Sequence, residues 1–523
     1  MSRSFRGDRL PGDQHVPTTH AHGDLTPQLI GTPVWYDQAV AAAGIPIYDA
    51  PFVSVGGGLG SFILTDVLRI QGAPASAIRV VSTSETPWQS WEYLTRVSQL
   101  PVRERIRSDA GARPDNLWGF PSYAMTEAWQ DKSIALAWQV LVEPLFADFF
   151  APRAGTVFAT VRKEAERISY WNMLAQGQVR MVRRRAGGGY FTLVTPPAGT
   201  TPTKRIAIRS RYVHLAVGYP GLKYLPDLQE FRETYNDYHR VVNAYEPHEH
   251  VYEFLKTRPG VVVVRGAGIV ASRVLQRLID DRERLGLQTQ IVHIFRTYVQ
   301  GSHGPGVWMR RKGGDGWAYQ AFTFPKSAFG GQLKAQYRNA DADKRKQLSK
   351  AVGGTTTPPL RRWQGQLRRG RQGNWYHPMQ AVVEKVEPTM DGRLLSHTRG
   401  DDGNRNRLVS DFVIDCTGLE ADMAEHRVLD DLLRNGGARR NGAGRLAVGP
   451  NFEVLGAASG DGALYASGAA TGGNHFLAVD SFMGMQTAAL DIAADLAKRG
   501  FVRRLGPVRS TNQWLKWALN RSI

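Results

Sequence analysis

The sequence contains a single cysteine, Cys416, among its 523 residues. One cysteine cannot form an intrachain disulfide, and it excludes Cys-x-x-Cys metal sites and the dithiol centres of disulfide and sulfide:quinone reductases. Long hydrophobic runs are also missing, because Glu143, Pro144 and Asp148 interrupt the most apolar stretch, residues 134–151. This interruption argues against a transmembrane span, and no apolar core of a secretory signal follows the N-terminal arginines. We therefore expect a soluble, cytoplasmic protein.

Acidic residues are scarce relative to basic ones, with 47 Asp and Glu against 66 Lys and Arg, a net charge of +19. Residues 301–375 hold 15 Lys and Arg against three Asp, so they supply 12 of these net charges. Four tryptophans, at positions 308, 317, 363 and 375, interleave with the basic residues. Such a segment suits an acidic partner such as nucleic acid or acidic lipid. A solvated insert whose charge aids solubility explains the same pattern equally well.

Two segments have the order strand, glycine turn, helix, strand. The first has apolar strands at 52–55 and 78–81 around a helix at 62–70. The second has strands at 261–264 and 291–295 around a helix that ends near residue 285. Two mononucleotide-binding βαβ units are therefore predicted.

The glycines of these turns have distinct roles in holding a dinucleotide. The first permits a tight bend, the second lets the backbone approach a pyrophosphate, and the third small residue allows close packing of helix on strand. The helix N-terminus then directs free N–H groups at the phosphates. The residues that meet these demands are Gly56, Gly58, Gly60 and Ser61 in the first turn, where Ser61 replaces the third glycine, and Gly266, Gly268 and Ala271 in the second.

The residue after each second strand discriminates between ribose ligands. A ribose 2′-hydroxyl requires a carboxylate, whereas a 2′-phosphate requires a cation. Arg296 follows the strand at 291–295, which favours NADPH over NADH at the second turn. After the strand at 78–81, the first acid is Glu85, which comes later than a ribose carboxylate is expected and is a candidate cofactor contact only if it reaches back to the ribose.

Three further strands carry a family resemblance. Residues 212–216 run into Gly218-Tyr219-Pro220, residues 411–416 run into Thr417-Gly418, and the strand from Leu464 ends in Gly468. These segments resemble the alanine-threonine-glycine strands of two-dinucleotide flavoproteins. The Gly-x-Pro continuation resembles the class B flavin-dependent monooxygenases, of the flavin-containing monooxygenase and N-hydroxylase type.

The resemblance implies an α/β fold of two Rossmann-like dinucleotide-binding domains, with an NADPH-binding domain inserted into an FAD-binding domain. The expected boundaries are an N-terminal extension at 1–45, an FAD domain at 46–240 and 405–500, an NADPH domain at 241–404 and a C-terminal tail at 501–523. The first turn would then bind FAD and the second NADPH, with Thr417, Gly418 and Gly468 as further cofactor contacts.

The activity that the resemblance implies is that of an NADPH-consuming monooxygenase. NADPH would reduce FAD, O2 would form a C4a-hydroperoxyflavin, and this species would oxygenate the nitrogen or sulfur of a small-molecule substrate. No catalytic side chain and no metal site is assigned, and the substrate and oligomeric state stay open.

The sequence departs from the family at two FAD contacts. Glu85 is displaced, and Gly468-Ala469 stands where Gly-Asp is usual. Glu233 and Asp237 follow Phe231 at the glycine and histidine places of the Baeyer–Villiger fingerprint, which speaks against that subclass.

A C-terminal helix offers a separate reason to expect a flavin. Asp480 or Ser481 can cap a helix that continues to Leu496, and its positive end would face the glycine-rich segment 471–475. His475 would then either line the flavin or substrate pocket or pack in the core.

Two alternatives belong to other functional classes. The basic segment and the tail at 514–521 are compatible with a peripheral NAD(P)H:quinone reductase on an acidic membrane. A binding protein that keeps the nucleotide fold and holds a polyanion or partner at residues 301–375 is the other. The same segment could instead gate a substrate channel or form a homo-oligomer interface.

Overall fold

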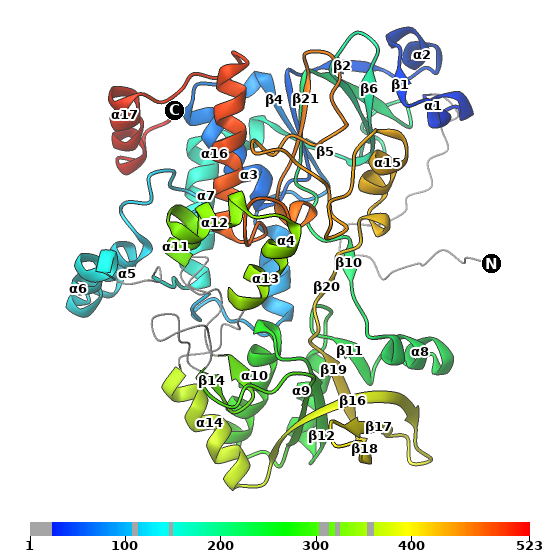
Figure 1. Ribbon diagram of the computed structural model, residues 1–523, viewed down its shortest axis with the longest axis vertical. Coiled ribbons are helices and arrows are strands. Elements are labelled where there is room, and N and C mark those ends of the chain that lie inside the picture. Colours follow the sequence, from blue (N-terminus) through cyan, green and yellow to red (C-terminus); the bar gives the residue numbers. More distant parts are fainter. Residues whose placement is uncertain (1–22, 107–112, 146–149, 303–312, 319–324, 353–359) are drawn as a thin grey trace.

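The computed structural model describes residues 23–106, 113–145, 150–302, 313–318, 325–352 and 360–523. These residues form two α/β halves, which are the upper and lower parts of Figure 1 and are called the first and second domains below. The chain passes between the halves in a two-stranded antiparallel ribbon of β10 (Gly221–Leu222) and β20 (Leu419–Glu420). The second domain is thus an insertion into the first, as predicted.

A five-stranded parallel sheet of order β21-β9-β3-β4-β5 forms the centre of the first domain. Its strands are β3 (Phe52–Val55), β4 (Ile78–Ser82), β5 (Leu174–Gln176), β9 (Tyr212–Leu215) and β21 (Ala463–Ala466). Strands β3, β9 and β21 are buried along their whole length, because helices cover a parallel sheet. Helices α3 (Leu59–Ile70) and α16 (Phe482–Lys498) come from opposite ends of the chain and pack side by side (Figure 1).

A second sheet of the first domain includes the N-terminal segment. Its order is β1-β6-β7-β8-β2, with β1 (Val34–Trp35), β2 (Ile47–Asp49), β6 (Gln178–Arg185), β7 (Tyr190–Thr195) and β8 (Ile206–Ser210). The extension expected over residues 1–45 is therefore replaced, where it is described, by folded structure that includes α1 (Pro27–Gly31) and α2 (Asp37–Ala42). Trp35 and Val40 are fully buried there, and Trp35 Nε1 donates to the Leu29 carbonyl at 2.8 Å. A few well-spaced apolar side chains were sufficient to dock this polar segment.

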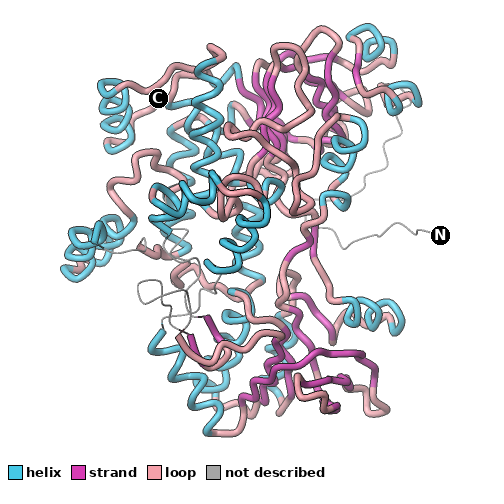
Figure 2. Tube along the Cα trace, viewed as in Figure 1, coloured by secondary structure: helices cyan, strands magenta, loops and turns pink. Residues whose placement is uncertain are grey.

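The second domain contains a seven-stranded sheet of order β11-β19-β12-β13-β16-β17-β18. Its strands are β11 (Val241–Asn243), β12 (Val261–Arg265), β13 (Gln290–Phe295), β16 (Tyr376–Pro388), β17 (Leu394–Gly400), β18 (Arg405–Ser410) and β19 (Phe412–Asp415). Alternate residues of β12 face opposite sides: Val262 and Val264 pack toward α10 (Ile269–Leu285), whereas Val263 joins the core beneath α8 (Pro226–Tyr235). Figure 2 shows the strands of each domain gathered together, with helices around them.

The boundary between the domains differs from the expected one at residue 405. Strands β18 and β19 belong to the second sheet, where β19 pairs in parallel with both β11 and β12. The chain therefore returns to the first domain only after β19, through β20. The apolar strand at 411–416 could complete either sheet, and its pairing partners decide which.

The basic segment divides between the two domains. Helices α11 (Pro325–Gly330), α12 (Gln332–Asn339) and α13 (Ala342–Val352) lie on the first domain, where Phe329 contacts Phe476 and Arg338 pairs with Asp491 of α16 at 2.9 Å. Helix α14 (Leu360–Gln372) packs on the second domain through buried Trp363. Trp308 and the cations at 310–312 lie outside the described residues.

Several cations of α14 are engaged within the chain. Arg362 pairs with Asp280 at 2.9 Å and Arg369 with Glu283 at 2.7 Å, both on α10. Part of the positive charge on which the predicted acidic partner depended is therefore used in ion pairs between α14 and α10.

The remaining helices cover the first domain. They are α4 (Gln89–Val97), α5 (Tyr123–Asp131), α6 (Ile134–Val142), α7 (Ala154–Arg167), α15 (Arg427–Asn435) and α17 (Pro507–Ala518), with α9 (Glu249–Thr257) in the second domain. The C-terminal α17 is tied to the chain before α5: Trp118 Nε1 donates to Ser510 Oγ at 2.7 Å and Trp514 Nε1 to the Phe120 carbonyl at 2.9 Å. Within the described ranges, we find no helix with the length and apolar character needed to cross a membrane.

Candidate functional site

The first glycine turn joins β3 to α3 at the carboxyl edge of the parallel sheet. Gly56 has φ +93°, and a Cβ there would lie 2.4 Å from the Ala216 carbonyl oxygen of the neighbouring chain segment. A Cβ on Gly57 would lie 2.3 Å from Ser82, at the end of β4. Gly58 differs, because it has ordinary extended backbone and nothing within 4 Å of the position that a Cβ would take. The turn is thus closed on the protein side and open at the N-terminus of α3, where a pyrophosphate would bind.

Gly60 and Ser61 support the turn from the inside. A Cβ on Gly60 would meet Ala216 at 3.3 Å and Met485 Sδ at 3.5 Å, so Gly60 provides the close packing expected of the third small residue. Ser61 is buried and its Oγ donates to the Gly56 carbonyl. Ser61 therefore stabilises the turn by a hydrogen bond, and Gly60 provides the close packing that was predicted for Ser61.

A buried hydrogen-bond chain links this turn to three strands. Ser54 Oγ on β3 donates to Ser61 Oγ at 2.8 Å and lies 2.9 Å from His214 Nδ1, while His214 Nε2 lies 2.8 Å from Ser467 Oγ after β21. His214 is fully buried on β9, and this burial lowers its pKa to about 3. The imidazole is neutral at physiological pH and connects β3, β9 and β21 beneath the turn. Sequence reasoning missed it, because a lone histidine within an apolar strand has no recognisable spacing.

Replacing His214 by Gln should make the protein less sensitive to acid. The folded protein holds His214 unprotonated down to about pH 3, whereas the unfolded chain protonates it near pH 6.5, so stability falls as pH falls between these values. Between pH 6.5 and 5 the wild type should lose about 2 kcal/mol more than His214→Gln. Urea unfolding at the two pH values measures this, with His377→Gln as the control at a partly exposed strand position. Equal losses in wild type and His214→Gln would contradict it.

The second glycine turn has the same construction. Gly266 has φ +118°, and a Cβ there would lie 2.8 Å from the Cys416 carbonyl oxygen. Gly268, the residue before α10, has extended backbone and nothing within 4 Å of a Cβ. A buried side chain again holds the first glycine: His293 Nε2 lies 2.7 Å from the Gly266 carbonyl, and its Nδ1 lies 2.9 Å from Tyr376 Oη. Ala271, also predicted, is fully buried on α10 and allows this helix to pack against the sheet.

Thr417 and Gly418 lie beside the second turn and not the first. They follow β19, which is the neighbour of β12. Asp415 fixes this corner: its Oδ1 accepts from the Thr417 N–H at 2.9 Å and its Oδ2 from the Leu225 N–H at 3.1 Å. Gly418 has φ +123° with no atom within 4 Å of a Cβ, so it continues the open edge of the second domain.

Three other predicted residues are placed as follows. Gly468 begins the turn after β21 with φ +73° and open space at its Cβ, at the same sheet edge as Gly58. Arg296 directly follows β13 and is exposed, at the same sheet edge as Gly266. Glu85 is exposed three residues beyond β4, and it is Ser82 that packs against the first turn. The structure thus brings the predicted residues together in two sets, one at the carboxyl edge of the parallel sheet in each domain.

The N-terminus of α16 lies close to the first turn, since Met485 packs against Gly60. Ser481 Oγ accepts from the Gly484 N–H at 3.1 Å, which confirms one of the two predicted caps. Asp480 instead accepts from the Tyr219 hydroxyl at 2.7 Å, and burial together with this contact raises the pKa of Tyr219. The Gly218-Tyr219-Pro220 segment is thereby attached to the N-terminal end of α16.

His475 lies in the loop before α16, next to the basic helices α12 and α13. It is almost fully buried, with its ring 4.8 Å from that of Phe452. Burial, with the nearby charges of Arg338, Arg345 and Lys334, lowers its pKa to about 4. The His475 imidazole is therefore neutral at physiological pH and lies close to the cationic side chains of α12 and α13.

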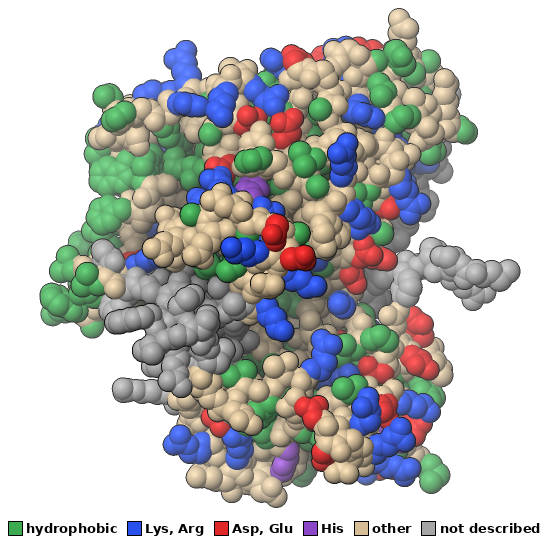
Figure 3. Space-filling model, in the orientation of Figure 1, with side chains coloured by type: hydrophobic (Ala, Val, Ile, Leu, Met, Phe, Trp, Pro, Cys, Tyr) green, Lys and Arg blue, Asp and Glu red, His purple; other side chains and the backbone are tan. Residues whose placement is uncertain are grey.

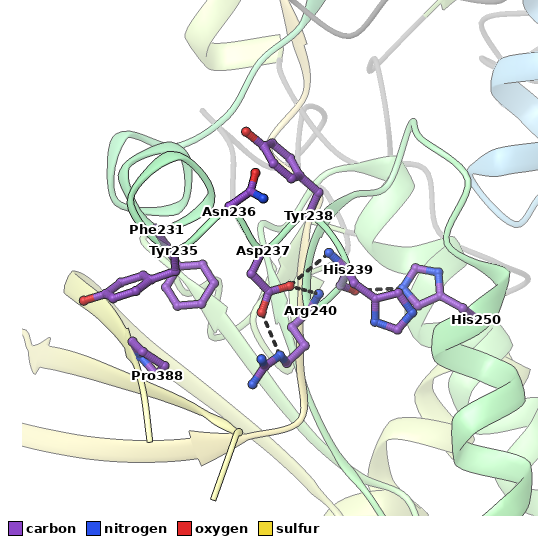
Figure 4. A pocket seen from close by; sticks show the side chains of 9 residues that line it. All are labelled: Phe231, Tyr235, Asn236, Asp237, Tyr238, His239, Arg240, His250 and Pro388. Atoms are coloured by element: carbon purple, nitrogen blue, oxygen red, sulfur yellow. Dashed lines mark hydrogen bonds and ion pairs between the residues drawn. The ribbon is translucent and has the colours of Figure 1, made fainter. Parts of the chain in front are cut away.

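A groove of about 700 Å³ opens elsewhere, on the second domain. In Figure 4, Asp237 directs its carboxylate toward Arg240, which it meets at 2.7 Å, and the rings of His239 and His250 lie next to each other at 4.0 Å. Its lining residues are Phe231, Tyr235, Asn236, Asp237, Tyr238, His239, Arg240, His250 and Pro388. Because Arg240 precedes β11, the groove lies at the amino edge of the sheet. Nucleotides bind at the carboxyl edge of such sheets, so this groove is separate from the glycine turns.

Comparisons with known proteins establish the fold. No protein-family model and no curated protein matches the chain. One similar solved structure is an ornithine hydroxylase from Pseudomonas aeruginosa, with a TM-score of 0.61 and 15% sequence identity over 86% of this chain and 100% of that one. A second is an ornithine N-hydroxylase from Kutzneria sp. 744, with a TM-score of 0.64 and 13% identity over 87% of this chain and 100% of that one. A third is an L-lysine 6-monooxygenase from Pseudomonas syringae, with a TM-score of 0.62 and 14% identity over 86% of this chain and 99% of that one. The Kutzneria structure is described as containing reduced FAD, NADP+ and L-ornithine. The predicted fold class, and the resemblance as far as it concerns the fold, are confirmed.

Proposed function

We propose that this chain, which has the fold of the flavin-dependent amine hydroxylases, is an NADPH-consuming flavoprotein monooxygenase that hydroxylates the nitrogen of a small primary amine. The enzymes of the same fold are named for ornithine and lysine, two amino acids whose side chains end in a primary amine. Chemistry of this kind needs two dinucleotides bound in facing domains, so the proposal depends on whether both sites fit their ligands.

The observation that carries the proposal is the pair of open glycine cradles. Gly58 and Gly268 each precede a helix in extended conformation, without a side-chain cap and with space where a Cβ would otherwise lie. In both turns a buried hydrogen-bonding side chain, Ser61 or His293, fixes the carbonyl of the first glycine. Two turns built in this way, in domains joined by a short ribbon, support the binding of FAD at the first and NADPH at the second.

The protein's own residues would perform positioning tasks around bound cofactors. FAD supplies hydride acceptance from NADPH and the activation of O2. The N-terminal end of α16, capped by Ser481 and close to the first turn, would stabilise negative charge on a reduced flavin through the positive end of its helix dipole. The covering helices α11 to α13 restrict access of water to the loop that carries His475.

Arg296 is the proposed ligand of the 2′-phosphate of NADPH. Arg296→Ala should lower kcat/KM for NADPH by about 10- to 100-fold, because a charge-assisted hydrogen bond to phosphate contributes about 1.5–3 kcal/mol. The value for NADH should stay within about twofold, since NADH has no 2′-phosphate. Initial rates of steady-state NADPH oxidation and NADH oxidation give the two kcat/KM values. Equal losses for the two nucleotides would assign Arg296 a structural role instead.

The proposed activity is tested by incubating the FAD-loaded protein with NADPH, O2 and a panel of primary amines, diamines and basic amino acids. The expected result is amine-dependent NADPH oxidation with formation of an equimolar hydroxylamine. A rate of NADPH oxidation that no amine changes, with a quinone as the electron acceptor, would favour the reductase alternative. Failure to bind FAD or NADPH would leave only the binding-protein alternative.

A further inference from the structure

The hairpin of α5 and α6 exposes large apolar side chains to an unusual degree. Helix α6 contains no charged residue and no buried residue, although Leu136 and Val140 lie against the first-domain core. The exposed fractions of the outward side chains are 88% for Trp129, 88% for Ile134, 64% for Trp138, 69% for Leu141 and 83% for Leu145. In Figure 3, hydrophobic side chains gather at the edge of the molecule where Figure 1 places this hairpin. Contiguous apolar surface of this kind marks an interaction site.

The exposed residues form one straight stripe. Ile134, Trp138 and Leu141 of α6 are spaced by four and three residues, so at about 100° per residue they fall within about 60° around the helix axis. Leu145 follows in the short 3-10 turn Glu143–Leu145 that continues from the helix. A stripe with alternating spacings of four and three is the seam by which one helix packs along another. The spacing therefore indicates a helical partner.

The charges around the stripe argue against an acidic membrane as that partner. Helices that bind acidic membranes place Lys and Arg beside their apolar face, and α6 has neither. Two arginines near the hairpin are engaged by its acids: Arg153 with Asp131, and Arg105 with Glu127 at 3.0 Å. The stripe is thus an uncharged surface in a chain of net charge +19.

The ends of α6 carry opposite charges. Lys132 lies two residues before the helix, and Glu143 directly follows it. In an antiparallel pair of α6 helices centred near Trp138, Lys132 of one copy would lie beside Glu143 of the other, at both ends. The same apolar stripe would face itself across a two-fold axis, as an isologous interface requires.

We propose that the α5–α6 hairpin is the dimerisation surface of this protein, and that its occupant is the same hairpin of a second copy, with α6 antiparallel to α6. Each large aromatic side chain buries about 150–250 Å². The two tryptophans and the aliphatic stripe together therefore approach the roughly 800 Å² that each partner contributes to a stable interface.

The test measures the mass of the full-length, FAD-loaded protein by sedimentation velocity across micromolar concentrations. The wild type should sediment at twice the chain mass of 58.0 kDa. The variant carrying both Trp138→Glu and Leu141→Glu should dissociate at concentrations about 100-fold higher than the wild type, since central aromatic anchors dominate interface energies. Val508→Glu on α17, whose side chain is 83% exposed, is the matched control and should stay dimeric.

A charge exchange tests the antiparallel arrangement without introducing acids into the stripe. Lys132→Glu should weaken the dimer by about three- to tenfold, because it opposes two glutamates at each end. Adding Glu143→Lys in the same chain should restore the wild-type affinity. Thermal unfolding and FAD content of each variant confirm that the fold is intact.

Each alternative occupant has a distinct result. A wild type that is monomeric throughout and sediments with anionic vesicles would overturn the proposal in favour of a membrane, and one that does neither would overturn it as well. A dimer that persists in the Trp138→Glu, Leu141→Glu variant would place the interface elsewhere. Failure of the Glu143→Lys addition to restore dimerisation would overturn the antiparallel pairing.

Discussion

Gly58→Ala should weaken FAD binding by at least about tenfold while leaving the apoprotein folded. The protein itself has room for the added methyl group, because nothing lies within 4 Å of a Cβ at this position and the backbone is in an extended conformation that alanine adopts readily. The methyl group would instead occupy the space at the N-terminus of α3 where the pyrophosphate must approach the backbone. Titration of the apoprotein with FAD, followed by flavin fluorescence, measures the dissociation constant.

The same substitution elsewhere separates ligand contact from helix capping. Gly506 precedes α17 with extended backbone, no side-chain cap and nothing within 4 Å of a Cβ. Gly506→Ala therefore reproduces the change in capping, which costs at most about 1 kcal/mol, on a helix that contacts Gln71 at the opposite end of α3 from Gly58. Its FAD affinity should equal that of the wild type. If Gly58→Ala also binds FAD normally, the first turn is not the pyrophosphate site.

Gly268→Ala should raise the KM for NADPH by at least about tenfold with little effect on FAD content. Gly268 likewise precedes α10 in extended conformation, and a Cβ there meets no protein atom within 4 Å. Anaerobic flavin reduction at varied NADPH concentration gives the apparent dissociation constant directly. The expected result is weaker binding with an unchanged limiting rate at saturation, because the substitution affects phosphate binding and not the position of the nicotinamide.

The two variants together assign one dinucleotide to each domain. Gly58→Ala should affect FAD and Gly268→Ala should affect NADPH, with no exchange between them. If Gly268→Ala instead loses FAD, the cofactor assignment of the two turns is reversed. If both variants lose both ligands, the substitutions act through the fold, which the thermal stability of the apoproteins would reveal.

Both glycine turns could be predicted from the sequence because their determinants are local. An apolar strand, glycines at fixed spacing and a following amphipathic helix occur within about 30 residues, and each requirement acts on neighbours in the chain. Gly56 and Gly266 were recognisable because the tight bend demands positive φ, which their φ values of +93° and +118° show.

Other features depend on contacts between distant residues. Ser467 and His214 are separated by 253 positions, and they meet only because β21 pairs with β9. The Cys416 carbonyl lies beside Gly266 because β19 pairs between β11 and β12. For the same reason Thr417 and Gly418, which follow β19, belong to the second domain. Strand order cannot be read from the strands themselves, since any buried apolar strand can pair with several others.

The sequence by itself determined the two βαβ units and the glycines that shape their turns, because these follow from spacing along the chain, and it limited the cap of α16 to two neighbouring residues. The two-domain α/β class, with one domain inserted into the other, was implied by the family resemblance of the strand ends. Only the tertiary structure decided which strands share a sheet, which cations of the basic segment are paired, and that Gly58 and Gly268 open onto free space while Gly56 and Gly57 do not. It also decided that the stripe on α6 faces outward, since the apolar composition of Ile134–Val142 equally suits a buried helix. These outcomes depend on which surfaces meet in space, and chain order alone does not specify that.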